Sequence, residues 1–286
     1  MHPTAKSLVL DLLSSLRGQA MPVRALVAAG ELFDLSAESI RVALVRLCDR
    51  GIIERNERGQ YRLAPAAQPV QQHVAAWMRT AERLVPWRAG WIGVHTAGLE
   101  RGDRSQVRRR ERALQFLGFR ALEPHLFVRP DNLKGGVDAV RTELLALGLD
   151  PSALVFGIDR FDSAVEERAR ALWDGQALSR AYRATRAALT RSAAGLARGP
   201  ARAAMVESFV LGGQAIRQLA LDPLLPEPIV PAGERAALVD AMRAYDRLGR
   251  ACWRGFMTSH GAPHLQAPRT AVAASWPPRE SAGAGL

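Results

Sequence analysis

The stretch 36–63 constrains the fold more than any other part of the chain, because a helical pattern with clear start and stop signals runs directly into a hairpin pattern. The Ser36 hydroxyl can accept from the orphan amide groups of a following helix, and Gly51 suits the left-handed conformation that often ends one. Two short strands are predicted near 52–55 and 60–63, joined by a four-residue turn. The buried stripe of the helix is predicted at Ile40, Leu44 and Leu47.

Arginines lie on the opposite face of this predicted helix and beside the turn of the hairpin. A helix fits the major groove of DNA, and an adjacent hairpin can reach the backbone or the minor groove. We therefore interpret the stretch as the recognition helix and wing of a winged helix-turn-helix; the alternative is an ordinary helix–hairpin unit with solvated arginines. The predicted major-groove residues are Ser39, Arg41, Val42, Val45 and Arg46, with Arg41 as the base reader. The predicted phosphate or minor-groove contacts are Arg50, Arg55, Arg58 and Arg62.

The balance of charge agrees with an anionic partner. The 286 residues carry a formal net charge of +11, and the basic charge is almost wholly arginine because Lys6 and Lys134 are the only lysines. Such a balance favours nucleic acid, or ligands that bear phosphates or carboxylates. Cys48 and Cys252 are far apart and show no zinc or disulfide spacing. With no signal-peptide pattern and no membrane-spanning run, we expect a cytoplasmic protein.

The order of predicted elements indicates an α+β, mostly helical fold. Helices over 4–17 and 23–32 precede the recognition helix, a linker is predicted over 64–72, and a helix follows over about 70–84. The middle of the chain has the β-α-β-β-α-β order of a ferredoxin-like domain: 91–96, 105–117, 119–122, 125–129, 136–147 and 154–158. Four helices are then predicted over 163–173, 177–194, 200–221 and 233–257. The expected division is a winged helix (1–67), a linker and connecting helix (68–86), the ferredoxin-like domain (87–161), a helical C-terminal domain (162–261) and a disordered tail (262–286).

Four stretches together give the chain a resemblance to a known family. They are 40–47 with Gly51, the wing segment 58–63, Trp91 to Val94, and Arg217 with the segment 221–226. Over about 5–258 the chain resembles the phenylacetate-degradation repressors, the PaaX-like transcriptional regulators of bacteria. The resemblance implies a homodimeric repressor of this three-part architecture that binds double-stranded DNA and releases it on binding an aryl-CoA thioester such as phenylacetyl-CoA.

Two positions depart from the family pattern. A Trp-Gly pair often follows the second proline motif, where this chain has Pro231-Ala232-Gly233, and Gly213-Gln214 stand where a histidine commonly precedes Arg217. These departures bear on the identity of the effector more than on DNA binding.

Candidate effector contacts come from basic and aromatic residues outside the winged helix. The densest basic run offers phosphate contacts, to DNA or to the diphosphate of a CoA ligand, or else a solvated helix face; its members are Arg101, Arg104, Arg108, Arg109, Arg110 and Arg112. The aromatic residues of the C-terminal helices can line an aryl pocket or form core; they are Trp173, Tyr182, Phe209, Trp253 and Phe256. The predicted effector-binding set is Arg109, Arg112, Arg180, Arg183 and Trp173.

Catalytic and metal-binding patterns are absent from the sequence. The six histidines show no ligand spacing, and there is no Gly-rich phosphate loop or nucleophile elbow. We expect no enzyme activity, cofactor or metal. The alternative from another class is a metal-dependent nuclease that uses Asp159 or Asp162 of the ferredoxin-like domain, although both residues are better explained by helix capping. A third alternative is a metabolite-binding module whose winged helix makes protein contacts.

Overall fold

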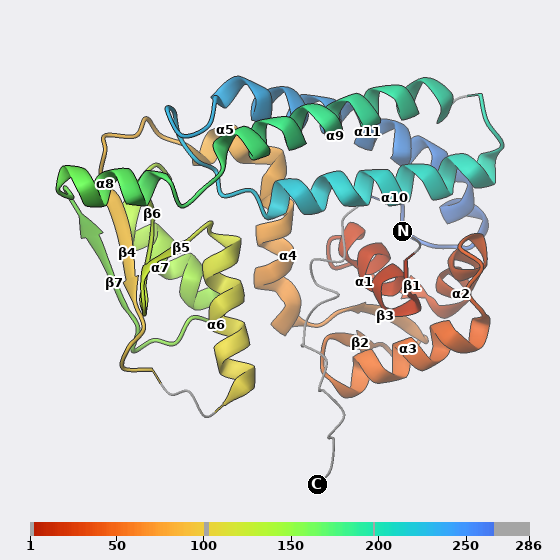
Figure 1. Cartoon of the computed structure of the whole chain (residues 1–286). Helices are drawn as coiled ribbons and strands as arrows, with labels where there is room; N and C mark the ends of the chain where they lie inside the picture. The colour runs from red at the N-terminus through yellow and green to blue at the C-terminus, as the bar shows by residue number, and fades with distance from the viewer. Residues whose placement is uncertain (1–2, 100–102, 197, 266–286) are drawn as a thin grey trace, which may run out of the picture.

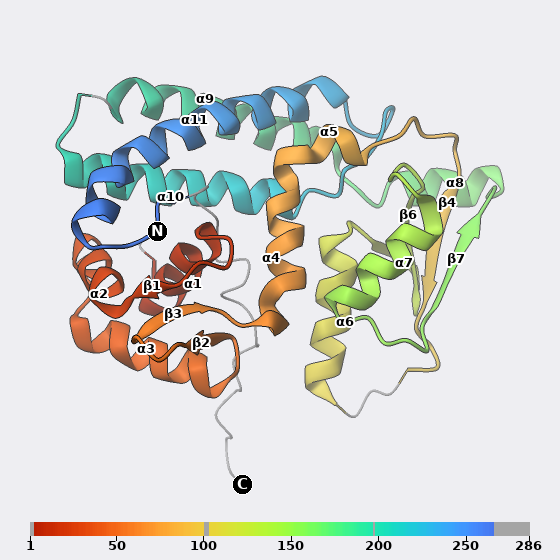
Figure 2. The same cartoon turned by 180° about the vertical axis from the view of Figure 1, so that it is seen from behind.

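The structure is a computed structural model that describes residues 3–99, 103–196 and 198–265. The fold is α+β and mostly helical, with two small antiparallel sheets. The molecule is elongated, and its long C-terminal helices run along the upper side in Figure 1. The N-terminal elements lie below one end of these helices, and the larger sheet lies at the opposite end of the molecule. The same arrangement is seen from behind in Figure 2.

The N-terminal elements follow the predicted order closely. The helices are α1 (Ala5–Ser15), α2 (Val23–Leu32) and α3 (Ala37–Asp49), and the hairpin is formed by β2 (Ile53–Arg55) and β3 (Gln60–Leu63). A further strand, β1 (Met21–Pro22), pairs with β3 and gives the sheet order β1-β3-β2. This two-residue strand is too short to leave a periodic signal, so the sequence did not predict it.

The core under these helices extends into the C-terminal region. The apolar sides of α1, α2 and α3 pack against α10 (Ala201–Ala220) and α11 (Ala232–Ser259). The residues that α10 and α11 contribute are Met205, Phe209, Trp253 and Met257. We call this buried cluster the N-terminal core. It means that the N-terminal elements and the last long helices share one apolar interior.

The connection between residues 64 and 84 differs from the prediction. The expected linker 64–72 is helical: a 3-10 turn, η1 (Pro65–Ala67), leads into α4 (Gln68–Ala75). Prolines are tolerated in a first helical turn because the amide groups there have no acceptor within the helix, so the N–H that proline lacks is not needed. The single helix expected over 70–84 is divided by a second 3-10 turn, η2 (Ala76–Arg79), before the short α5 (Thr80–Arg83).

The unit that contains the larger sheet has four strands and two helices, in the predicted order. They are β4 (Trp91–His95), α6 (Arg104–Phe116), β5 (Arg120–Glu123), β6 (Leu126–Pro130), α7 (Gly136–Leu147) and β7 (Leu154–Ile158). The strand order is β5-β6-β4-β7, and every neighbouring pair is antiparallel. The helices α6 and α7 lie on the side of the sheet that faces the rest of the molecule (Figure 1).

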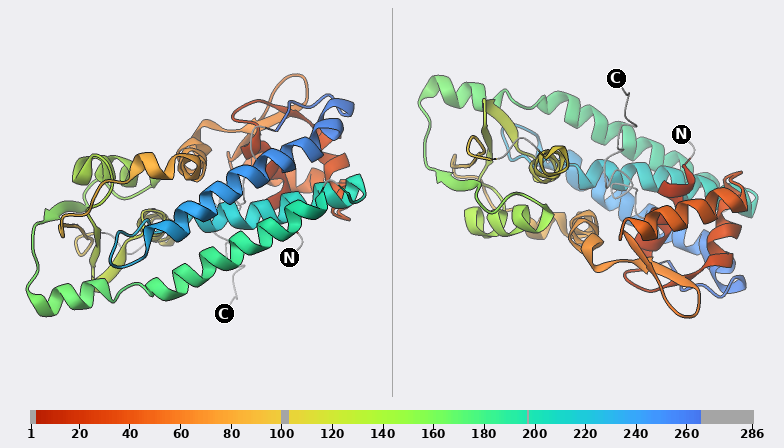
Figure 3. Two further views of the ribbon diagram at one scale, coloured as in Figure 1. Left: turned by 90° about the horizontal axis from the view of Figure 1, so that it is seen from above. Right: turned by 90° about the horizontal axis from the view of Figure 1, so that it is seen from below.

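The remaining helices are α8 (Ser163–Arg170) and α9 (Gly175–Leu196), followed by α10 and α11. The helix predicted over 163–173 ends early, and Asp174 accepts from the amide of Ala177 at 2.8 Å to start α9. The predicted disordered tail is wrong for 262–265, because Leu265 is buried in the N-terminal core; residues 266–286 lie outside the described chain. Figure 3, left, shows α9 and α11 running side by side along the top of the molecule.

Candidate nucleic-acid interface

The predicted start and end of helix α3 are confirmed. The amide of Ser39 donates to Ser36 Oγ at 3.1 Å, which supplies one of the missing acceptors of the first turn. At the other end Gly51 has φ +61° and its amide donates to the Cys48 carbonyl at 2.8 Å. The predicted stripe of Ile40, Leu44 and Leu47 is buried in the N-terminal core. This packing fixes which face of α3 points outward.

The outward face of α3 carries the five residues predicted for the major groove, and the predicted phosphate contact Arg50 is its C-cap. Every one of them is exposed: Ser39, Arg41, Val42, Val45, Arg46 and Arg50. The side chain of Val45 is 58% exposed, which is unusual for a valine in the middle of a helix. Arg41, Arg46 and Arg50 make no ion pair with any residue of the described chain. Their guanidinium groups are therefore available to an outside partner.

The hairpin is held in shape by Asn56. Its side-chain carbonyl accepts from the amides of Arg58 and Gln60, at 3.1 and 2.9 Å. The three predicted wing arginines differ in their surroundings. Arg62 forms an ion pair with Glu54, which is its partner in the strand register. Arg55 lies 6.0 Å from the ring centroid of Tyr61, whereas the exposed Arg58 makes no ion pair among the described residues.

Helix α3 and the hairpin occupy one side of the molecule. Both lie at the bottom of the view in Figure 1, with α1 above them, and both face the viewer in the right panel of Figure 3, which looks from below. The exposed face of α3 is the one turned away from α1. The long C-terminal helices lie on the opposite side, at the top of Figure 1.

The predicted effector residues are not brought together. Trp173 is buried and stacks on Trp91 at 6.2 Å between ring centroids, and Arg180 and Arg183 pair with Asp174 and Glu234 on the exposed side of α9. Arg109 and Arg112 belong to α6, which lies well below α9 in Figure 1. The five residues thus occupy at least two separate places. Tyr182, Phe209 and Trp253 are buried core residues, and Phe256 packs beside Trp253.

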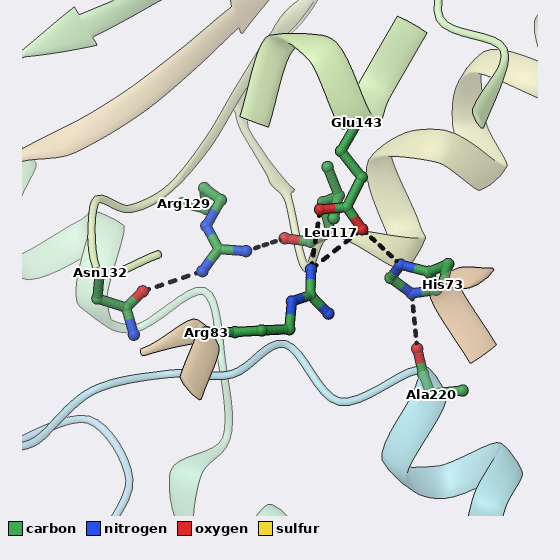
Figure 4. Close-up of polar contacts among 7 residues, drawn as sticks. All are labelled: His73, Arg83, Leu117, Arg129, Asn132, Glu143 and Ala220. Carbon is green, nitrogen blue, oxygen red and sulfur yellow. Dashed lines mark hydrogen bonds and ion pairs between the residues drawn. The ribbon is translucent and has the colours of Figure 1, made fainter. Parts of the chain in front are cut away.

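A buried polar cluster that the sequence did not reveal lies where α4, α5, α7 and the end of α10 meet. His73 Nδ1 is 2.9 Å from Glu143 Oε1, and His73 Nε2 is 3.0 Å from the carbonyl oxygen of Ala220 (Figure 4). Arg83 donates to both carboxylate oxygens of Glu143, at 3.0 and 2.9 Å. Burial raises the pKa of Glu143, but the hydrogen bond from His73 and the charge of Arg83 outweigh it and hold the pKa below its ordinary value.

Arg129 extends this cluster into the sheet. Its guanidinium is fully buried and donates to the Leu117 carbonyl and, at 2.9 Å, to Asn132 Oδ1. The Asn132 amide in turn donates to the Leu224 carbonyl at 2.7 Å. Burial lowers the pKa of Arg129 to about 9. The cluster therefore ties strand β6 to the loop 222–226 that follows α10.

That loop is also fixed from the C-terminal side. Asp222 Oδ1 accepts from the amide of Leu224 at 2.8 Å and so fixes a turn at this position. The buried guanidinium of Arg235 lies 3.9 Å from Asp222 Oδ1 and donates to the Leu225 carbonyl at 2.6 Å. The segment 221–226, one of the four family-like stretches, thus connects the sheet, α10 and α11 through fixed contacts.

Two hollows border the polar cluster. An enclosed cavity of about 10 Å³, lined in part by His73, Arg129 and Asp222, is close to the size of one water molecule. Outside it, an open cleft of about 430 Å³ lies between the segment 69–83 and α7, with Arg79, Arg83 and Glu143 on its walls. The cleft is within the volume range of small-molecule sites. No local motif marks it, because its walls come from distant parts of the sequence.

The two residues considered for a nuclease are a helix cap and an exposed surface residue. Asp162 accepts from the amides of Ala164 and Val165, both at 3.0 Å, so the capping interpretation of this residue is confirmed. Asp159 is exposed beside a surface hollow. In the described part of the chain no three histidine, cysteine or acidic side chains are grouped as metal ligands would be. None of the described helices is long and apolar enough to cross a membrane.

Comparisons with known proteins agree with the resemblance at the N-terminus. Residues 4–67, which contain α1 to β3, match the family model described as PaaX-like protein. No curated protein matches the chain. An uncharacterized protein from Mycobacterium tuberculosis, Rv0674, has a similar solved structure, with a TM-score of 0.52 and 24% identity over 87% of this chain and 98% of that chain. This likeness shows a shared fold. Over residues 4–67 the chain is therefore similar to the PaaX-like family.

Proposed function

We propose that the chain is a sequence-specific, DNA-binding transcriptional regulator. The observation that carries the proposal is the outward face of α3, where Arg41, Arg46 and Arg50 are exposed without ion-pair partners among the described residues. An arginine on such a face can donate two hydrogen bonds to guanine in the major groove. In this proposal α1 to β3 form a winged helix-turn-helix, with α3 as recognition helix and the β2–β3 hairpin as wing. The PaaX-like match over residues 4–67 supports a regulator.

The finer proposal is a dimeric repressor that an aryl-CoA thioester, phenylacetyl-CoA or a close relative, releases from DNA. The β4–β7 unit, with its β-α-β-β-α-β order, is then a ferredoxin-like domain that helps to form the effector site. The cleft between 69–83 and α7 is the best available site, because it adjoins the polar cluster that contacts the end of α10. The other half of α10 lies in the N-terminal core. An effector that favours another position of α10 would shift the population toward dimers whose two α3 helices no longer match the half-sites.

The proposal is tested by fluorescence anisotropy on a labelled duplex from the upstream region of the protein's own gene. A duplex of random sequence and equal length is the control, and each titration is repeated with phenylacetyl-CoA and with free CoA. We expect tighter binding to the upstream duplex than to the random one, and release by the thioester alone. Specific binding that ignores the thioester would keep the DNA-binding proposal and reject the effector.

Equally weak binding to both duplexes at moderate salt would contradict the proposal. The metal-dependent nuclease is then examined by incubating labelled DNA and RNA with Mg²⁺ or Mn²⁺, with Asp159→Ala as the variant that should abolish cleavage. A metabolite-binding module without a nucleic-acid partner would give no salt-dependent DNA affinity and no cleavage.

A further inference from the structure

Helix α6 carries an unusual concentration of positive charge. Its described arginines are Arg104, Arg108, Arg109, Arg110 and Arg112, while Glu111 is the only acidic residue within the helix. Asp103, immediately before the helix, accepts from the amide of Ser105 at 2.7 Å and so serves as its N-cap. Arg101 lies outside the described residues.

One side of α6 faces the connecting helix α4 and carries some of these arginines. The ring of Phe116 lies 4.8 Å from that of His73 on α4, which fixes the side of α6 that faces the connecting helix. Residues four and seven positions earlier return to this side, so it carries Arg112 and Arg109, with Arg108 beside them. Burial and the nearby charge of Arg109 lower the pKa of Arg112, which agrees with guanidinium groups on a shared face.

The first turns of α6 lie on the same side of the molecule as α3 and the hairpin. Figures 1 and 2 show α6 extending down to the level of α3, with α4 between them, and its first residue is at the lower end. In the right panel of Figure 3, α6 (yellow) is seen nearly end-on from the side on which α3 and the hairpin are exposed. Arg104, in the first turn, is exposed and makes no ion pair with any residue of the described chain.

We propose that the first two turns of α6, through Arg104 and Arg108, form a second phosphate-binding strip that holds the DNA flanking the segment read by α3. The inference rests on the proposed DNA-binding function and extends its footprint beyond the winged helix. A guanidinium fork binds phosphate oxygens through two parallel hydrogen bonds, so this helix requires no base contacts to contribute affinity. The strip adds contacts only when the duplex is long enough to reach it.

The test compares two random duplexes, one of about 12 base pairs, which is little more than one helical turn, and one of about 30. Binding is measured by anisotropy over a range of salt concentrations for the full chain, for Arg104→Glu and for the double variant Arg104→Ala/Arg108→Ala. The plot of log K against log salt has a negative slope, and each lost phosphate contact makes it shallower by about 0.9. We expect the double variant to lose about one to two units of slope on the long duplex and none on the short one.

The matched control is Arg191→Ala, which removes one exposed charge from α9 on the opposite side of the molecule. Unchanged affinity and slope of both α6 variants on the long duplex would overturn the inference, as would an equal loss for the control. An equal loss on both duplexes would also overturn it, because it would indicate a general charge effect. If the double variant unfolds at a lower temperature than the wild type, only the binding result for Arg104→Glu is used, because Arg104 is exposed and its replacement should not disturb the fold. Wild-type protein that binds neither duplex would contradict the DNA-binding proposal itself.

Discussion

The ring of Phe33 packs against the ring of Phe209 with their centroids 5.2 Å apart. Phe33 follows α2, next to the helix proposed to read DNA, whereas Phe209 lies in the middle of α10. Both rings are buried, with 3% and 5% of their surface exposed. The ring of Trp253 on α11 also packs against that of Phe209, with their centroids 5.7 Å apart. The position of the elements that we propose to read DNA is thus set by helices from the other end of the chain.

Phe209→Ala tests how strongly this contact holds the molecule together. We expect the variant to lose about 3–5 kcal/mol of unfolding free energy, because it removes a buried ring that packs against Phe33 and Trp253 and leaves a cavity in the core. Urea unfolding followed by tryptophan fluorescence measures the change. Leu248→Ala, which truncates a side chain that is 39% exposed on α11, is the control and should change stability by less than about 0.5 kcal/mol. Similar small losses for both variants would show that the ring contact is dispensable.

Arg41→Ala tests the reading of bases by α3. Since the exposed Arg41 has no ion pair to lose within the described chain, its removal should leave the fold unchanged and cost about 1–3 kcal/mol of binding to the specific duplex. Binding to random DNA should weaken less, so that discrimination falls. Anisotropy on both duplexes measures the two losses. An equal loss on the two duplexes would assign Arg41 to a phosphate contact.

The wing arginines are expected to differ from one another. Arg58 makes no ion pair in the described chain, so Arg58→Ala should reduce the salt slope by about 1 on any duplex. Arg62 is paired with Glu54 on the neighbouring strand, and Arg62→Ala should therefore have the smaller effect on DNA affinity. Salt titrations of the two variants are compared directly. A larger loss for Arg62→Ala would mean that the ion pair opens in the complex and that the wing contacts DNA along its strands.

The buried carboxyl of Asp11 makes the stability of the folded chain depend on pH. This carboxyl on α1 is buried, and burial raises its pKa well above the ordinary value despite the nearby charge of Arg217. Because the folded state holds the proton more tightly than the unfolded chain, stability falls as the pH rises from the unfolded pKa of about 3.9 through the folded pKa. Asp11→Asn removes this loss. We expect the variant to be more stable than the wild type at neutral pH, with the difference shrinking as the solution is acidified.

Urea unfolding of both proteins at several pH values between about 4 and 8 tests this expectation, because the difference should grow as the pH rises above the unfolded pKa. A constant difference between the proteins would contradict it. So would a variant that is less stable at neutral pH, since that result would mean that the ionised Asp11 gains more from Arg217 than it loses by burial.

The sequence predicted the elements whose signals are local. The bounds of α2, α7, β3 and β7 agree with the prediction, and the cap and stripe of α3 are confirmed, because Ser36 and Gly51 act on their own neighbours. The same rules misplaced the segment 64–72. Its alanines, prolines and glutamines resemble a linker in composition, but Val70, Val74 and Trp77 become buried only when the distant α10 and the sheet are in place.

The polar cluster was beyond the reach of sequence reasoning for a related cause. His73 and Glu143 are 70 positions apart, and each of them alone has an ordinary surface interpretation. The predicted effector residues do not lie together in the structure. Helix periodicity predicts on which face of its helix a residue lies, but it does not predict where that helix lies in the fold. The predicted α3 face could be located because one short segment contains both its buried and its exposed sides.

The N-terminal core has a practical and an evolutionary consequence. A fragment ending at residue 67 would leave Phe33 and the apolar sides of α1 and α2 without the cover of Phe209, Trp253 and Leu265. Such a fragment is a poor substitute for the whole protein in binding studies, although it spans the whole family-model match. For the same reason, residues 1–67 can be exchanged for those of a relative only if the residues of α10 and α11 that pack against them are changed as well.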